Sequence, residues 1–407
     1  MGWDSNPRKA CTFGGFQDRC LKPLGHPSVC QAYTPGTRSG NGHRSRSHYR
    51  RVVAFGMAAR HYAGCGMGRF GWAAVIALVL PAGVAIPLAM AAPPASAPPP
   101  PDPASIVTIQ VENDAVSTYR GTSDQYYTAG QRISYTSPTT AVPEFLAEFG
   151  RNVWGDGTQR ISVNLGQSIF TPRDTQARRV DPRDRPYAGY LHLDAALLHD
   201  TADTHSLIGV SLGVVGPSAL GEQVQNGFHN LIGDTPNRGW KSQLPDEPAV
   251  EVLLEQTYRL PLTRFNGFEV DVLPSLTAGV GTVRDYVQAG GVVRIGQGLN
   301  SDFGPARIRP GLSGSDAYTP TRPFAWYAFA GLDGQAVGRD VFLDGSTFRS
   351  NSPHTTKRFF VGEAQGGLAV MAYGLRLTYT QVFQTPSFDR QRSGVFNFGS
   401  LALSARF

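Results

Sequence analysis

The sequence predicts an all-β protein, a twelve-stranded antiparallel transmembrane β-barrel with a short helix in an extracellular loop. Three observations predict it: apolar and polar residues alternate through much of the 407-residue chain, glycine is abundant at 47 residues, and only 17% of residues are charged. A strand with one apolar and one polar face suits a barrel with lipid outside and water inside. Such strands must close into a ring, because hydrocarbon offers no partner to an unpaired backbone group.

The N-terminal part of the chain differs from the rest. Residues 1–66 carry ten Lys or Arg, two Asp or Glu and all four cysteines, whereas the chain from Met67 onward has a net charge of −2. This argues against a nucleic-acid-binding protein, since the positive charge lies in an aperiodic segment that we interpret as an upstream extension, outside the native protein. The cysteine spacing fits no zinc motif.

A secretory signal peptide is predicted at residues 67–91, with translation starting at Met57 or Met67. Arg69 lies in a positive n-region, residues 75–88 form an apolar h-region, and Ala89-Met90-Ala91 is an A-x-A cleavage site. The apolar run is short and broken by prolines, which argues against a transmembrane helix. Residues 92–104 are then a Pro-rich periplasmic linker, and residues 105–407 form the outer-membrane barrel.

Twelve strands are expected from period-two alternation, as in Val107, Ile109 and Val111 against Thr108 and Gln110. They are 106–114, 127–137, 159–169, 187–199, 204–215, 248–259, 267–280, 286–298, 323–334, 359–370, 372–384 and 394–407. Most reach the roughly 9–11 residues of a tilted membrane strand. The alternative is a soluble β-sandwich or lipocalin-like barrel, which alternation alone does not exclude. The signal peptide, strand lengths and aromatic strand ends favour the membrane.

The loop helix is predicted within the longest outer connection. With a periplasmic N-terminus, segments 115–126, 170–186 and 216–247 lie outside the cell, while 200–203 and 261–266 are periplasmic turns; 138–158 is long for such a turn. Helical spacing in 216–247 predicts an amphipathic helix that Ser218 caps and Gly233 ends. Its apolar face holds Leu220, Val224, Phe228 and Leu231, and its polar face Glu222, Gln225 and His229.

Candidate chemistry lies at the outer rim. His229 would sit on the ordered helix, and an acid, Asp234, follows it five residues later. Asn113 and Asp114 end the first strand close to Thr128 in the second, and such oxygen ligands suit a hard cation like Ca²⁺. A cation there would hold an ester carbonyl while a neutral histidine activates water. The alternatives are a solvated loop histidine and an Asn-Asp pair that only makes a turn.

Six ordered blocks resemble the outer-membrane lipid A 3-O-deacylase family, most strongly over residues 106–260. The blocks are Glu112-Asn113-Asp114, Tyr127-Thr128-Ala129-Gly130, Gln167-Ser168-Ile169-Phe170-Thr171-Pro172, Asp184-Arg185-Pro186-Tyr187-Ala188-Gly189, the run Gly216-Pro217-Ser218 to Ile232-Gly233 around His229, and Gly239-Trp240 to Asp246-Glu247-Pro248. The C-terminal strands share the family's pattern of alternation.

The resemblance implies Ca²⁺-dependent hydrolysis of the 3-position acyloxyacyl ester of lipid A, at a site between the barrel wall and the loop helix. It makes His229 the base, and places Asn113, Asp114 and Thr128 at the metal and oxyanion site, with Asn113 and Asp114 as metal ligands. Asp234 falls where the family can carry Glu. The cations near the family's loop lysine are Arg173, Arg178 and Arg179. The partner is lipopolysaccharide of the outer leaflet, and a monomer is expected.

Two other functions fit the same fold. One is a non-enzymatic outer-membrane barrel acting as a pore, an adhesin or a structural protein. The other is an outer-membrane phospholipase with a Ser/His pair, for which Ser211 is the candidate. Gly209-Val210-Ser211-Leu212-Gly213 matches G-x-S-x-G, but the motif needs a strand–turn–helix elbow, whereas this stretch lies within a predicted strand.

Overall fold

A computed structural model describes residues 99–118, 124–305, 307–309, 311–313, 316–392 and 394–407. The chain divides into two compact units, residues 1–79 and 80–407, and every described residue belongs to the second. The predicted upstream extension, signal peptide and start of the linker lie outside the described residues.

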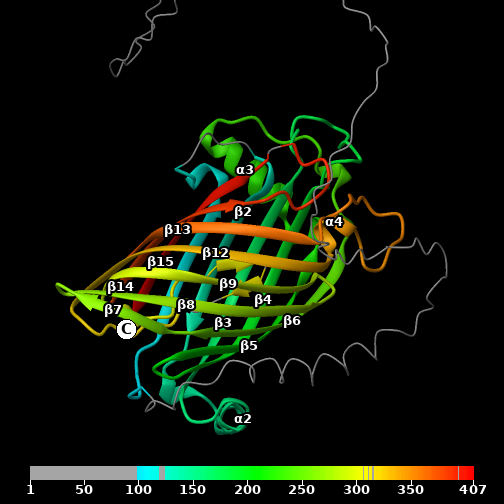
Figure 1. The fold of residues 1–407 in the computed structure, drawn as a ribbon. Helices are drawn as coiled ribbons and strands as arrows, with labels where there is room; N and C mark the ends of the chain where they lie inside the picture. The colour runs from blue at the N-terminus through cyan, green and yellow to red at the C-terminus, as the bar shows by residue number, and fades with distance from the viewer. Residues whose placement is uncertain (1–98, 119–123, 306, 310, 314–315, 393) are drawn as a thin grey trace, which may run out of the picture. The chain divides into compact units, whose positions relative to one another are not determined.

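The strands form one closed antiparallel ring (Figure 1). Each strand pairs with its sequence neighbour in the wall, β1 pairs with β15, and β8 pairs with β6, which closes the ring. Strand β7 follows β6 directly and continues its pairing with β8, so the wall has the twelve strands that the sequence predicts. The wall strands are β1 (Ile106–Asn113), β2 (Tyr126–Thr136), β3 (Thr158–Thr171), β4 (Ala188–Asp200), β5 (Thr204–Val215), β6 (Glu247–Tyr258), β7 (Leu260–Phe265), β8 (Phe268–Gly281), β9 (Arg284–Gln297), β12 (Phe324–Asp340), β13 (Phe360–Ala372), β14 (Leu375–Gln384) and β15 (Phe396–Arg406).

One predicted turn is wrong. Residues 261–266 were expected to form a periplasmic turn, but β7 extends to Phe265. The reversal takes only Asn266 and Gly267, both with positive φ, 48° and 82°. A two-residue turn with φ above zero at both positions matches the twist of a hairpin, and an Asn-Gly pair makes it readily.

Alternation along the strands separates two environments. On β1 the side chains of Thr108, Gln110 and Glu112 are buried in the interior, while Ile109 and Val111 are exposed on the outer surface. Exposed apolar side chains recur in this way on β2 to β5, β9 and β13 to β15. This is the pattern of a wall with lipid on its outer side.

The two ends of the ring carry different connections. We call the end with the connections after β1, β3, β5, β8, β12 and β14 the α3 end, because α3 (Gly221–Ile232) follows β5 there. It also carries η2 (Asp114–Val116), η4 (Pro217–Ala219), η5 (Trp240–Ser242) and α4 (Val341–Asp344). The other end carries η3 (Thr139–Ala141) and α2 (Glu144–Trp154).

Helix α2 accounts for the long connection 138–158. The helix packs on two strands. Gln159 of β3 donates to the carbonyl of Ala147 in α2, and the ring of Trp154 in α2 stacks on that of His199 in β4. Phe145, Phe149 and Val153 recur every four residues and are exposed. No helix in the described part of the chain is long and apolar enough to span a membrane.

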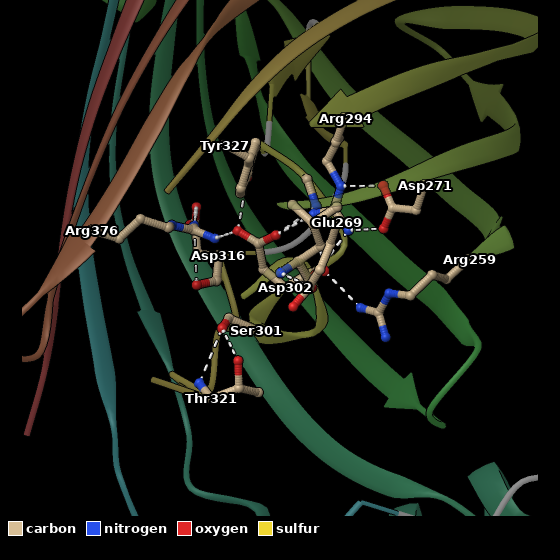
Figure 2. Close-up of polar contacts among 12 residues, drawn as sticks. Arg259, Glu269, Asp271, Arg294, Ser301, Asp302, Asp316, Thr321, Tyr327 and Arg376 are labelled. Atoms are coloured by element: carbon tan, nitrogen blue, oxygen red, sulfur yellow. Dashed lines mark hydrogen bonds and ion pairs between the residues drawn. The ribbon is translucent and has the colours of Figure 1, made fainter. Parts of the chain in front are cut away.

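A chain segment fills the interior. The connection from β9 to β12 starts at the end opposite α3 and includes η6 (Leu299–Ser301), β10 (Arg307–Arg309) and β11 (Gly311–Ser313). Figure 2 shows its Asp302 and Asp316 among side chains of the ring. We call its described residues between Gly298 and Pro323 the lumen segment. Asp302 pairs with Arg294 at 2.7 Å and Arg376 at 3.0 Å, and Asp316 pairs with Arg132 at 2.8 Å. The interior, which the sequence predicts to be lined by water, therefore holds a chain segment that buried ion pairs tie to several strands.

Candidate functional site on the outer face of the wall

Helix α3 lies directly against β4, and two glycines allow it. A Cβ on Gly189 would lie 3.1 Å from the backbone nitrogen of Gly221, and one on Gly221 would lie 2.7 Å from the Trp240 ring. The predicted helix and its end at Gly233 are confirmed, since Gly233 has φ 78° and donates its N–H to the carbonyl of His229. The predicted Ser218 cap is wrong, because the backbone N–H and hydroxyl of Ser218 both donate to Asp246.

Helix α3 buries its polar side chains and exposes most of its apolar ones. Its polar residues Gln225 and His229 are buried, with His229 only 6% exposed, whereas Phe228 is 52% and Leu231 82% exposed. Only Val224 of the apolar face lies against the buried Ile169–Tyr187–Trp240 cluster. Exposing these apolar side chains to water would be unfavourable, whereas contact with lipid makes an exposed apolar face favourable. The helix thus holds a buried histidine beside a surface suited to acyl chains.

His229 is fixed through both ring nitrogens. Its Nδ1 lies 3.0 Å from the carbonyl oxygen of Thr235, and its Nε2 lies 2.8 Å from Oδ2 of Asp124. A carbonyl only accepts, so Nδ1 carries a proton, and Nε2 is the nitrogen able to exchange one with a substrate. Asp124 belongs to the connection between β1 and β2, which joins α3 to that connection.

Asp124 and Asn237 are functional candidates that the sequence reasoning missed. Asn237 donates to Asp124 over 3.2 Å, and its backbone exchanges two hydrogen bonds with the side chain of Asn226 on α3. Gln225 accepts a bond from the buried indole of Trp240. An acid in the segment preceding Tyr127-Thr128 was visible in the sequence, but a partner 105 positions away follows only from the fold.

Asn113 and Thr128 lie on the outer face of the wall, beside the part that α3 covers. Asn113 shares the outward parity of Ile109 and Val111 and lies opposite Ala129. The register shifts at Thr128, and its hydroxyl is 2.7 Å from that of Thr171. Ala129, the next residue, packs against the cluster that also holds Val224 of α3. The structure thus brings these two residues and His229 to one end and one face.

The remaining predicted residues are placed less centrally. Asp114 is buried at the start of η2. The carboxylate of Asp234 is exposed and accepts the N–H of Thr235, and among described residues it has no bond to the His229 ring. Arg173, Arg178 and Arg179 are exposed in the connection between β3 and β4, at the same end as α3.

A metal site is only partly supported by the donors present. In the described ranges, no three His, Cys, Asp or Glu side chains group so that they could hold a metal ion. A calcium site would therefore draw on amide, hydroxyl and backbone oxygens as well as carboxylates. Asn113 and Thr128 on the outer face supply oxygens of this kind.

Ser211 lies in a different place. It is inside β5, as the sequence predicts, and its hydroxyl is 2.8 Å from that of Tyr190. The nearby His192 uses Nδ1 to contact Asp194 at 2.8 Å. Within the described residues, Ser211 has no hydrogen bond to a histidine, so the geometry of a serine nucleophile with its base is missing there.

A closed twelve-stranded antiparallel ring with an apolar outer surface defines the class of the protein, an outer-membrane β-barrel. The sequence model of the family described as "Outer membrane protein LpxR" matches residues 75–407. The chain therefore belongs to the LpxR family of outer membrane proteins, which confirms the resemblance seen in the motif blocks.

One solved structure supports the fold. LpxR from Salmonella typhimurium superposes with a TM-score of 0.62 at 18% identity, covering 74% of this chain and 99% of that one. The beta domain of the Bordetella autotransporter Brka matches with a TM-score of 0.38 at 9% identity, covering 75% and 99%. A search of curated proteins found no match.

Proposed function

We propose that the protein is an outer-membrane hydrolase that removes the 3-linked acyloxyacyl chain of lipid A, with His229 as general base. The observation that carries the proposal is the contact between the buried His229 and the half-buried Asp124, at the outer face of the wall and beside a helix whose apolar residues are exposed. Family membership supports the same substrate. The active site would face the outer leaflet, where lipid A is found.

The reaction would be a direct hydrolysis. Water attacks the ester carbonyl carbon while Nε2 of His229 takes its proton, and the tetrahedral intermediate then expels the sugar 3-oxygen, which receives that proton. The products are the free 3-hydroxyl and the acyloxyacyl acid. Because Asp124 now lies at Nε2, the water has to enter there as the carboxylate shifts, after which Asp124 can pair with the imidazolium.

The surroundings of His229 suit a lipid ester. The exposed Phe228, Leu231 and Ile232 offer an apolar surface for acyl chains, and Arg173, Arg178 and Arg179 offer charge for lipid phosphates at the same end. Asn113 and Thr128 would face the developing oxyanion, directly or through Ca²⁺, with Asp114 as a further candidate ligand. Asp234 is a weaker candidate because its carboxylate is exposed.

The test is deacylation of lipid A in mixed micelles, with the products followed by mass spectrometry. Wild-type protein should release the 3-linked acyloxyacyl group, and His229→Ala should lower the rate by about 100-fold or more, the usual contribution of a general base. His354→Ala is the matched control, since His354 lies in the connection between β12 and β13 and, within the described residues, its ring has a hydrogen bond only to the backbone carbonyl of Ser352. Full activity of His229→Ala would refute the mechanism.

Calcium is tested separately with the same assay. Chelation should abolish activity and added Ca²⁺ should restore it if a hard cation holds the ester oxygen. Activity that is unaffected by chelator would remove Ca²⁺ from the proposal, and with it the ligand role of Asn113 and Asp114, but would leave the histidine mechanism intact.

A further inference from the structure

A second candidate site lies inside the ring, at its α3 end. A cavity of about 80 Å³ opens there beneath α4, and three arginines line it: Arg185, Arg284 and Arg307. Phe170 and Tyr127 form part of its wall. This volume has room for several water molecules or for one small polar group. Phe170 has the inward parity of β3, whereas Thr171 beside Thr128 has the outward parity, so the wall separates this cavity from His229.

Arg185 is the unusual member of the cavity wall. It is only 5% exposed, and its guanidinium carbon lies 4.5 Å above the centre of the Phe170 ring. Its backbone N–H bonds to Asp184, but its guanidinium has no hydrogen bond or ion pair within the described residues. Burial lowers the pKa of Arg185 to about 10, so it remains charged at neutral pH. A buried charge without a partner is costly, and such charges are normally paired.

The other two arginines are already engaged. Arg284 donates to Gln335 over 2.6 Å and lies 3.4 Å from Asp340. Arg307 donates to Gln365 over 2.8 Å and lies 3.5 Å from Glu112.

The carboxylates near the cavity have other donors as well. Asp340 accepts the N–H of Phe342, Glu112 accepts the hydroxyl of Tyr127, and Glu363 accepts from Gln384. Asp340 and Asp184 attract the charge of Arg185 from a distance, but among the described residues no carboxylate forms an ion pair with its guanidinium.

We propose that Arg185 binds an oxyanion, a phosphate or carboxylate group, in this cavity. A planar guanidinium stacked on an aromatic ring presents its N–H groups in a fixed fork, which suits two oxygens of one anion. Arg284 lies on the same cavity wall and would add positive charge. The ligand is either a free anion or an anionic group of an outer-leaflet lipid, and the proposal does not depend on the deacylase activity.

The experiment titrates the full chain in neutral detergent with sodium phosphate and, separately, sodium acetate, at constant ionic strength set with chloride. Isothermal calorimetry gives the affinity, and the melting temperature gives an independent reading, since a ligand of the folded state raises it. Arg185→Gln should weaken binding by about tenfold or more, as expected for lost charge-assisted hydrogen bonds. Arg183→Gln is the matched control, because Arg183 is exposed in the same connection and paired with Asp181.

Arg185→Lys covers the case in which Arg185→Gln does not fold. It keeps the charge but loses the fork, so binding should weaken while the barrel survives. The proposal is overturned if neither anion binds the wild type, or if Arg183→Gln weakens binding as much as the Arg185 variants do. Lipopolysaccharide in the micelles identifies the source: competition with phosphate indicates a lipid headgroup, and phosphate binding without competition indicates a free anion.

Discussion

At the scale of single residues, the candidate site depends on a contact between Asp124 and His229. Asp124 joins the ring of His229 to Asn237, and Asn237 is bonded to Asn226 of α3. These bonds make Asp124 a positioning residue in the proposed mechanism, because it holds the imidazole and the β1–β2 connection together. Removing it should leave the wall strands untouched and loosen the site.

Asp124→Ala should lower the rate of lipid A deacylation by about 10- to 100-fold, the range expected when a reacting group is misplaced by about 1 Å. Asp124→Asn, which keeps the hydrogen-bonding shape, should retain more activity than Asp124→Ala. Asp156→Asn is the control, since Asp156 is exposed in the connection that holds α2. Equal activity of all three variants and wild type would show that Asp124 does not position the base.

The acids of the lumen segment predict a pH dependence of stability. Burial alone would raise the pKa values of Asp302 and Asp316, but the arginines around them, Arg294 and Arg376 for Asp302 and Arg132 and Arg376 for Asp316, hold both below the ordinary 3.8. Because the folded-state pKa is lowered, their contribution to stability is full above about pH 4 and is lost as the pH falls through the folded-state values.

The melting temperature of the barrel in detergent should therefore be steady above about pH 5 and fall below pH 4. Asp316→Asn should destabilise the protein by about 3 kcal/mol at pH 7, because Arg132 loses its buried counter-charge. The variant should also lose less stability on acidification than the wild type does. A wild-type curve that stays flat down to pH 3 would contradict this account.

At the scale of elements, period-two alternation predicted the twelve strands of the wall, because one face of each strand meets lipid and the other polar groups, but it missed β7, the continuation of β6. Periodicity also predicted α3 and its end at Gly233, but not which face of the helix is buried. Hydrophobicity alone assigns the apolar face to the core, and only the membrane beside the wall makes the opposite orientation favourable. Asp124 escaped prediction for a related reason: a loop acid has no periodicity, and its partner is distant in sequence.

The exposed face of α3 gives a prediction that separates binding from chemistry. Leu231→Asp with Phe228→Asp should raise KM for micellar lipid A about tenfold or more, while kcat changes little, since the apolar contact serves binding before and during the reaction. Stability should change by no more than about 0.5 kcal/mol, as for most exposed positions. Asn230→Asp adds a charge at an exposed position of the same helix and is the control. A fall in kcat alone would contradict a role in substrate binding.

Helix α2 should lie in the membrane interface. Its Phe145, Phe149 and Val153 are exposed, and so are Tyr135 of β2 and Val163 of β3, the two strands that α2 connects. With the four cysteines of residues 1–66 replaced by serine, a nitroxide at position 149 should be accessible to oxygen and shielded from a water-soluble nickel reagent. A nitroxide at position 151, on the side that pairs Arg151 with Glu144, should show the reverse. Equal access of the nickel reagent to both positions would place α2 in water.

At the scale of the whole molecule, closure of the ring followed from the strand count and the need to pair every backbone group in lipid. The presence of a chain segment inside the ring could not be predicted from the sequence in this way. The connection between β9 and β12 has no alternation from which its position inside the ring could be predicted. In the sequence, its acids Asp302 and Asp316 resemble ordinary loop residues. Only the ring brings Arg132, Arg294 and Arg376 from separate strands to meet them. Figure 2 shows Arg294 and Arg376 on either side of Asp302.

The filled interior bears on whether the protein is a pore. Asp302 and Asp316 tie the lumen segment to strands β2, β9 and β14, so we expect the segment to obstruct the passage of ions through the ring. In planar lipid bilayers the wild-type protein should show no stable channel steps. Asp302→Ala with Asp316→Ala leaves three buried arginines without those partners, which should release the segment and produce conductance, provided the variant still shows the β-sheet circular dichroism of the folded barrel. Stable steps from the wild type would show that the segment does not seal the ring, and would favour a pore over an enzyme whose chemistry lies on the outer face of the wall.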